Sequence, residues 1–120
     1  RRVLFRSDER VKCIVSSEGG IGLSFSNWED GGILARKSQR RDSGGNTMNL
    51  LALIAPRPFL LPAGESADGD RSWPYLEAAL PAYRWSGKPT HLAWFNHGAG
   101  HRYPPEALRV AEAFLDRALK

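Results

Sequence analysis

The pattern of hydrophobic and polar positions divides most of the chain into short apolar runs and longer amphipathic stretches. Three short, mainly apolar runs bounded by glycine, proline or polar residues are typical of buried strands in a parallel sheet, at residues 10–17, 57–62 and 90–95. Two longer segments, residues 72–85 and 105–119, repeat apolar residues at spacings of three and four, which predicts amphipathic helices.

The apolar positions also predict which face each helix buries. In the first helix the expected buried face consists of Tyr75, Leu76, Ala79, Leu80 and Tyr83. Pro81 lies within this pattern, so we expect a kink or a helix end there. In the second helix the expected face consists of Leu108, Ala111, Leu115 and Leu119, with Phe114 beside it. A shorter helix is predicted over residues 48–54, capped by Asn46 or Thr47, and a further one over residues 27–34.

The order of these elements predicts an α/β fold with three parallel strands and flanking helices. In such sheets, active-site groups collect on loops at the carboxyl ends of the strands. Three loops have this position: residues 18–22, 64–70 and 96–103. Each carries polar or ionisable residues beside glycines, so we expect a functional site where they meet.

Composition limits the classes of protein to consider. The chain has 120 residues and a single cysteine, which excludes an internal disulfide framework and a cysteine-rich zinc site. No apolar run reaches the roughly 20 residues of a membrane-spanning helix, so no membrane partner is expected.

The net charge of +4 comes mainly from residues 1–7, RRVLFRS, which resemble a translated sequencing-library adapter. We expect these residues to be a non-native artefact. Without their three arginines, 14 basic residues face 13 acidic ones. We interpret the remaining basic cluster, Arg36, Lys37, Arg40 and Arg41, as a solvated loop, and no nucleic-acid partner is expected.

The three loops contain two parts of a hydrolytic triad. Acyl transfer by hydrolases uses a nucleophile, an imidazole that accepts its proton and a carboxylate that orients the imidazole. His101 follows the Gly-Ala-Gly loop at residues 98–100 and is the predicted base. His97 is expected to support that loop. Four acidic residues follow the first or second strand and could orient the imidazole: Glu18, Glu65, Asp68 and Asp70.

No nucleophile can be assigned from the residues. The chain contains no G-x-S-x-G turn, the usual nucleophile elbow of this chemistry. Cys13 lies within an apolar run, where an inert thiol is expected. His97 and His101 have a spacing that binds zinc from a helix, but Gly98 and Gly100 oppose a helix, so no metal is expected. The glycines at residues 19–22 lack a dinucleotide-binding pattern, so no cofactor is expected.

Three segments carry a family resemblance: RVKCIVSSEGGIGLSFSNW, LLALIAPRPFLLPAGESADGDRSWPYLEAALPAYR and FNHGAGHRYPPEA. Together they resemble the C-terminal half of an α/β-hydrolase of the acetyl xylan esterase, glucuronoyl esterase and dienelactone-hydrolase-like group. The resemblance implies that His101 is the catalytic histidine. It matches Asp68 to the acid after the penultimate strand, one residue further from Gly64 than usual, which keeps Asp70 as an alternative. Glu18 resembles the acid that some glucuronoyl esterases place one strand earlier.

The resemblance further implies that residues 8–120 are a partial α/β-hydrolase domain whose nucleophile elbow lies upstream. The expected function is a serine carboxylester hydrolase that forms an acyl-enzyme on small-molecule or carbohydrate esters. This fragment would supply the histidine and the acid, and we expect it to be inactive alone. Two alternatives stay open: a non-catalytic α/β binding or interaction module, and a metal-dependent enzyme that uses His97 and His101.

Overall fold

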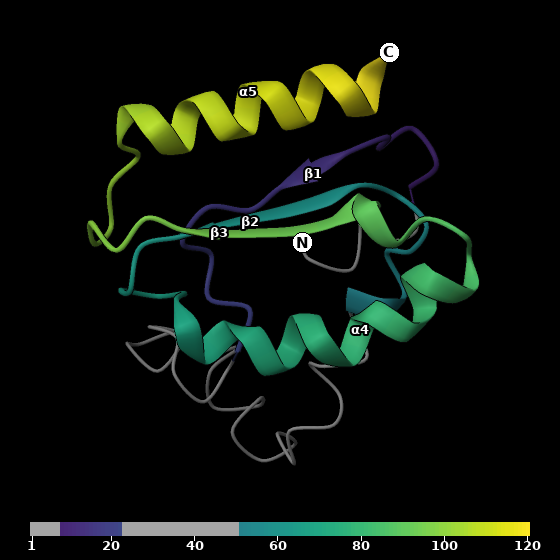
Figure 1. Cartoon of the computed structure of the whole chain (residues 1–120), viewed down its shortest axis with the longest axis horizontal. Helices are drawn as coiled ribbons and strands as arrows, with labels where there is room; N and C mark the ends of the chain where they lie inside the picture. Colours follow the sequence, from purple (N-terminus) through teal and green to yellow (C-terminus); the bar gives the residue numbers. More distant parts are fainter. Residues whose placement is uncertain (1–7, 23–50) are drawn as a thin grey trace.

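A computed structural model describes residues 8–22 and 51–120, which form a three-layer α/β arrangement (Figure 1). The strands β1 (Ile14–Val15), β2 (Phe59–Ala63) and β3 (Leu92–Asn96) form one sheet in the order β1-β2-β3. The helix α4 (Trp73–Trp85) covers one face of the sheet and α5 (Pro105–Leu119) covers the other. The α/β class with three parallel strands and flanking helices, predicted from the alternating pattern, is confirmed.

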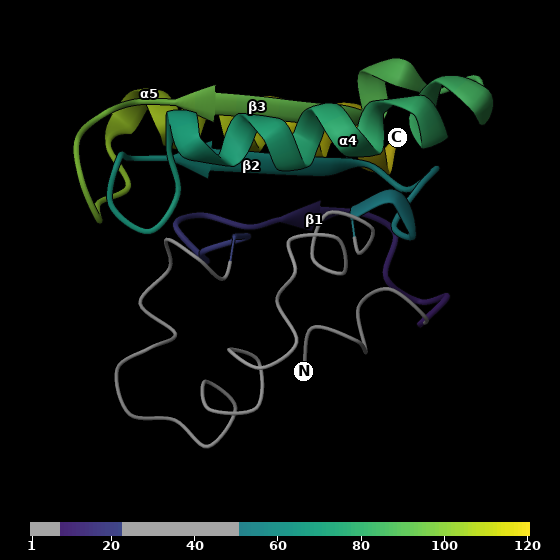
Figure 2. The same cartoon turned by 90° about the horizontal axis from the view of Figure 1, so that it is seen from below.

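The register brings the carboxyl ends of the strands to one edge of the sheet. β2 and β3 are parallel, with Phe59 opposite Leu92 and Ala63 opposite Asn96. β1 pairs with the other side of β2 and is also parallel to it. Figure 2 shows the three strands running side by side in this order. The loops that follow the strands therefore begin close together, as the sequence predicted.

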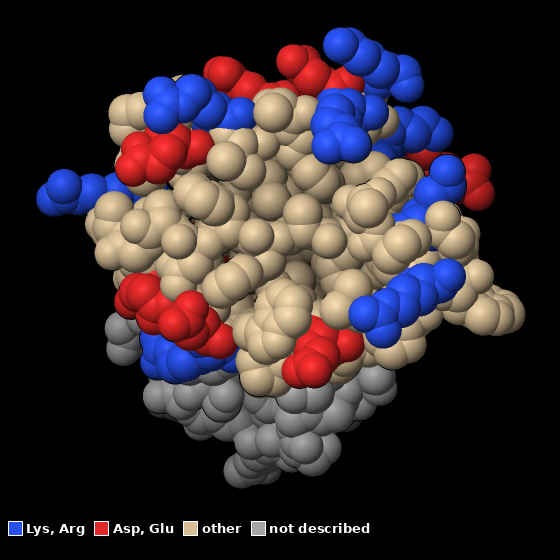
Figure 3. Space-filling model, in the orientation of Figure 1, with Lys and Arg blue, Asp and Glu red and all other residues tan. Residues whose placement is uncertain are grey.

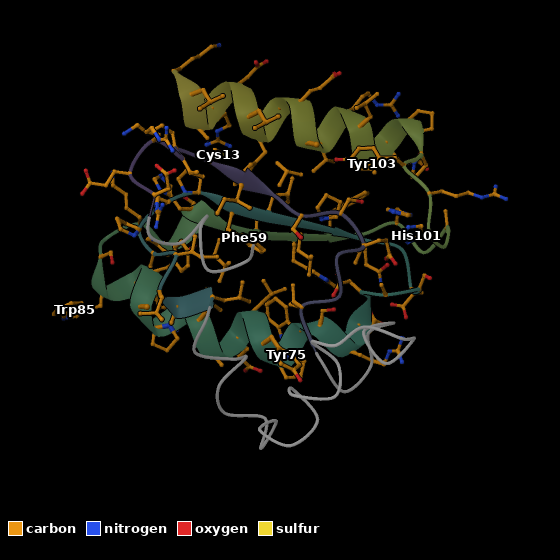
Figure 4. All side chains as sticks on the ribbon, turned by 180° about the vertical axis from the view of Figure 1, so that it is seen from behind. Cys13, Phe59, Tyr75, Trp85, His101 and Tyr103 are labelled. Atoms are coloured by element: carbon orange, nitrogen blue, oxygen red, sulfur yellow. The ribbon has the colours of Figure 1, made fainter. Side chains whose placement is uncertain are left out.

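The main core lies between the sheet and α4. Its fully or nearly fully buried members from these elements are Phe59, Leu61, Tyr75, Leu76 and Ala79. Figure 4 shows Phe59 and Tyr75 directed into the space between β2 and α4. Each large apolar side chain buried in this way contributes about 1.5–3 kcal/mol. The predicted buried face of α4 is confirmed, with Leu80 half-buried at its margin.

Pro81 does not end α4, which continues to Trp85. A proline within a helix leaves the carbonyl four residues earlier without its usual N–H donor. Pro81 and Glu77 are both exposed, so water can satisfy the carbonyl of Glu77. The exposed face of an otherwise well-packed helix therefore tolerates the proline.

The strands are shorter than predicted or displaced from the predicted bounds. β1 spans two residues, although its pairing with β2 continues through a hydrogen bond from the amide of Glu18 to the carbonyl of Pro62 (3.3 Å). β2 begins two residues later than predicted and extends through Ala63. A 3-10 turn, Pro89–His91, occupies the predicted beginning of β3. Proline supplies no amide donor and favours turn geometry, which delays the strand.

α5 has the predicted bounds, but part of its predicted buried face is wrong. Ala107 and Ala111 are the buried residues of this helix, whereas Leu108 is 48% exposed and Leu119 is 61% exposed. Leu115 and Phe114 are half-buried. Small side chains let the helix backbone approach the sheet closely, and the larger leucines then lie at the sides of the contact.

Some sequence predictions fall outside the described residues. These are the helix at residues 27–34, the basic cluster at residues 36–41 and the beginning of the helix at residues 48–54, of which Leu51 and Ala52 are described as helical. Within residues 8–22 and 51–120, no helix is long and apolar enough to cross a membrane. On the face shown in Figure 3, Lys, Arg, Asp and Glu side chains surround a broad area without charged groups.

Candidate functional site

The three predicted loops meet at the carboxyl edge of the sheet. The amide of His97 donates to the carbonyl of Ala63 (2.8 Å), and the amide of Gly100 donates to the carbonyl of Gly64 (2.6 Å). Glu18, three residues after the end of β1, accepts a hydrogen bond from the amide of Gly64. The predicted meeting of these loops is confirmed, because each contact joins segments that are distant in sequence.

Glu18 is a buried carboxylate held by backbone amides. Its side chain accepts from Gly64 through Oε1, and from Ala67 and Asp68 through Oε2, the last at 3.4 Å. The residue is 6% exposed and has φ of +48°, a left-handed conformation that is uncommon for a side chain with Cβ. These backbone N–H groups supply the hydrogen bonds that water would make to the side chain if it were exposed.

His101 lies against Glu18 at the solvent boundary. Its Nδ1 is 3.8 Å from Oε2 of Glu18, and its side chain is 72% exposed. This separation exceeds the length of a hydrogen bond but lies within the range of an ion pair when the imidazole is protonated. Catalytic hydrogen bonds are often long in unliganded enzymes and shorten when substrate binds. The pair therefore consists of a fixed, buried carboxylate and a more exposed imidazole.

Asp68, the acid that the resemblance favoured, is fully buried and makes different contacts. Its Oδ2 accepts from the amide of Gly20 (2.6 Å), and its Oδ1 accepts from the amide of Ile21 (2.8 Å) and the hydroxyl of Ser72 (3.0 Å). Both oxygens thus accept hydrogen bonds from the turn that follows Glu18, and Oδ1 also accepts one from Ser72 at the start of the next helix. Asp68 joins the first and second loops together.

Asp70 and Glu65, the other acidic candidates, lie on exposed parts of the second loop and share a contact with Asn96. The side-chain amide of Asn96 donates to Oε1 of Glu65 and to Oδ1 of Asp70, the latter at 2.9 Å. The oxygen of the same side chain accepts from the amide of Gly98 (3.0 Å). This group of contacts stabilises the outer side of the junction between the second and third loops.

His97 has a local role in its own loop, as predicted. Its Nδ1 accepts from the amide of Ala99 (3.1 Å), so the neutral ring carries its proton on Nε2. Within the described part of the chain, Nε2 is buried and has no hydrogen-bond partner. No cluster of three or more potential metal-ligating His, Cys, Asp or Glu side chains occurs in residues 8–22 and 51–120.

Gly64 permits the close approach of the second and third loops. A Cβ at this position would overlap the carbonyl oxygen of Gly100 and lie 2.7 Å from Cε1 of His97. Real Cβ atoms almost never approach other atoms so closely. The position therefore requires glycine for steric reasons, and the contact places the loop that carries His101.

Cys13 lies away from this group of residues. It precedes β1, whereas the functional loops follow the strands, and Figure 4 shows it at the opposite end of the sheet from His101. Burial raises the pKa of its thiol, which disfavours the reactive thiolate. Both observations agree with the inert thiol predicted at this position.

Three residues of the site were not identified from the sequence. From the sequence, Asn96 and Gly64 are only the first residues of two predicted loops, and Ser72 is only the first residue of a predicted helix. Asn96 and Gly64 each directly follow or end an apolar run, and Ser72 follows Asp68 by four residues. These local signals are common in loops, so they do not reveal which distant groups the residues contact.

Comparisons with protein-family models, with curated proteins and with solved structures found no match for this chain. The geometry of Glu18, His101 and the loops that hold them is therefore the basis for inferring a function.

Proposed function

We propose that this chain is the C-terminal part of an α/β-hydrolase that cleaves carboxylic esters, with His101 as the general base and Glu18 as the acid that orients it. The nucleophilic serine would come from sequence outside these 120 residues, because the chain has no G-x-S-x-G turn. The substrate class is a small-molecule or carbohydrate-linked ester, as the resemblance to acetyl xylan and glucuronoyl esterases implies.

The observation that carries the proposal is the 3.8 Å approach of His101 Nδ1 to the buried carboxylate of Glu18. A triad requires an acid on one imidazole nitrogen and an accessible second nitrogen for the nucleophile. The position of Glu18 supports the first requirement, and the high exposure of His101 supports the second. Asp68 is less suited to this role, because three donors already occupy its oxygens.

The proposed ester hydrolysis uses the positions of His101 and Glu18. Nε2 of His101 would accept the serine proton while the serine oxygen attacks the ester carbonyl, and the alcohol would leave with that proton. Water would then release the acid from the acyl-enzyme by the same route. The carboxylate of Glu18 would stabilise the imidazolium formed in each step, and its backbone donors keep it from rotating away.

Hydrolysis of nitrophenyl acetate tests the proposal. We expect no activity from the 120-residue chain and activity from a version joined to its natural upstream sequence. In the active version, His101→Ala should lower kcat by a factor of about 10²–10⁴, the usual contribution of a general base. Glu18→Gln should cause a loss of comparable size, because the imidazole would lose the charge that orients it.

His91→Gln is the matched control. The ring of His91 contacts the carbonyl of Pro56 (2.7 Å) at the start of β3, remote from the three loops. This variant should keep kcat and KM close to those of the parent protein. Hydrolysis that survives His101→Ala at the parental rate would overturn the assignment of the base.

A further inference from the structure

The turn after β1 and the loop after β2 hold each other through two buried carboxylates. Glu18, in the first segment, accepts hydrogen bonds from backbone amides of the second, at Gly64 and Ala67. Asp68, in the second segment, accepts from backbone amides of the first, at Gly20 and Ile21. Glu18 is 6% exposed and Asp68 is 0% exposed. We call this arrangement the reciprocal clasp.

We infer that Asp68 is a positioning residue: it fixes the turn at residues 18–21 and thereby holds the carboxylate of Glu18 against His101. This inference rests on the proposed roles of Glu18 and His101. Asp68 reaches the second and third residues after Glu18, so it acts on the backbone that directs the Glu18 side chain. The hydroxyl of Ser72 also donates to Oδ1 of Asp68, at 3.0 Å, and so anchors this side chain to the start of α4.

The clasp explains why a residue with Cβ can keep the left-handed conformation found at Glu18. That conformation is strained for a residue with Cβ and persists only when surrounding contacts determine it. The amide of Glu18 is bound to β2, and its carboxylate is bound to the second loop. Asp68 then fixes the amides of Gly20 and Ile21. Loss of one carboxylate oxygen at Asp68 therefore weakens the constraint on the carboxyl-terminal side of the turn.

Asp68→Asn is a sharp perturbation, because no orientation of the amide satisfies the site. With its oxygen toward Gly20, the new NH₂ group faces the amide donor of Ile21. In the opposite orientation, NH₂ faces the amide donor of Gly20 at the position where the carboxylate oxygen now lies 2.6 Å away. One backbone donor loses its acceptor in each case, although the side chain keeps its size and shape.

The experiment is a double-mutant cycle read by NMR on the 120-residue chain. Glu18→Gln is made in the parent and in Asp68→Asn, and the ring ¹H and ¹⁵N resonances of His101 are recorded in all four proteins. In the parent, Glu18→Gln should move these resonances, because it removes the adjacent charge. In the Asp68→Asn background, Glu18→Gln should no longer move the His101 resonances, since Glu18 would no longer lie against the imidazole.

Asp70→Asn is the matched control, because it neutralises an exposed carboxylate two residues away that contacts Asn96. The effect of Glu18→Gln on His101 should persist in full in this background. Persistence of the full effect in Asp68→Asn as well would overturn the positioning role and leave the proposed function intact. Absence of any effect in the parent would overturn both, because the contact between Glu18 and His101 would not exist.

Ser72→Ala provides a milder second variant in case Asp68→Asn does not fold. It removes one donor to Asp68 and keeps the carboxylate. We expect a partial reduction of the Glu18→Gln effect on the His101 resonances. An unfolded Asp68→Asn together with an unreduced effect in Ser72→Ala would assign Asp68 to folding alone and overturn the inference. Ester hydrolysis by the extended protein tests the proposed function independently of these signals.

Discussion

Gly64→Ala is the perturbation that tests most directly how the site is assembled. The added Cβ would overlap the carbonyl oxygen of Gly100 and lie 2.9 Å from its carbonyl carbon. It would also lie 2.7 Å from Cε1 of His97. Two of these three atoms belong to the backbone, so rotation of one side chain cannot relieve the overlap. The loop that carries His101 must move away from β2.

The expected cost follows from this geometry. Overpacking a tight contact costs about 1–3 kcal/mol. Separation of the loops would also break the hydrogen bond from the amide of Gly100 to the carbonyl of Gly64, now 2.6 Å, and a lost backbone hydrogen bond costs about 1 kcal/mol. We therefore expect Gly64→Ala to lower the free energy of unfolding by about 2–4 kcal/mol.

Urea denaturation followed by tryptophan fluorescence measures this free energy, and Gly87→Ala is the control. Gly87 has φ of +71°, and a Cβ added there would meet no atom within 4 Å, so alanine introduces backbone strain without overlap. That strain costs about 1–2 kcal/mol. In the extended protein, Gly64→Ala should also abolish ester hydrolysis, whereas Gly87→Ala should leave it unchanged.

A loss of less than about 1 kcal/mol in Gly64→Ala would refute the reasoning, because the close approach of the loops would then contribute nothing to stability. The amide of Gly100 supplies a second check. Its hydrogen exchange should become faster in Gly64→Ala and stay slow in Gly87→Ala. Unchanged exchange in Gly64→Ala would show that the hydrogen bond to residue 64 survives the added methyl group.

Four further predictions concern packing and pH. Tyr83 is 0% exposed and its hydroxyl donates to the carbonyl of Arg57 (2.9 Å), so Tyr83→Phe should lower the free energy of unfolding by about 1 kcal/mol in urea denaturation at pH 8. Burial raises the pKa of Tyr83, so Tyr83 ionises only in the unfolded state as the pH passes about 10. Between pH 8 and 11 the free energy of unfolding of the parent should therefore fall by about 1.4 kcal/mol more than that of Tyr83→Phe, in the same assay. Ala111→Leu should destabilise the protein by about 1–3 kcal/mol by thermal unfolding, because Ala111 is 4% exposed against the sheet. Leu108→Ala should change the stability by less than about 1 kcal/mol, because Leu108 is 48% exposed, and a larger loss would contradict the observed orientation of α5.

Local periodicity accounts for the part of the fold that the sequence predicted well. The buried face of α4 and the bounds of α5 follow from apolar spacing within one helix, which neighbouring residues specify by themselves. The order of strands and helices also predicted a parallel sheet, and therefore the edge at which the loops meet. The orientation of α5 was less predictable, because alanine and leucine satisfy the same apolar pattern and only the distance to the sheet selects between them.

The amino-acid pattern was sufficient to predict the α/β class, the loops that meet at the carboxyl edge, and a set of candidate residues that included His101 and four acids. It did not reveal that Glu18 lies beside His101 while Asp68 binds the turn after β1, because these contacts form between distant loops. Glu18 and Asp68 are 50 positions apart. Their contacts depend on the strand register and on the close approach of the second and third loops at Gly64. No local pattern encodes those distances, so the partner of each carboxylate emerges only when the loops pack together.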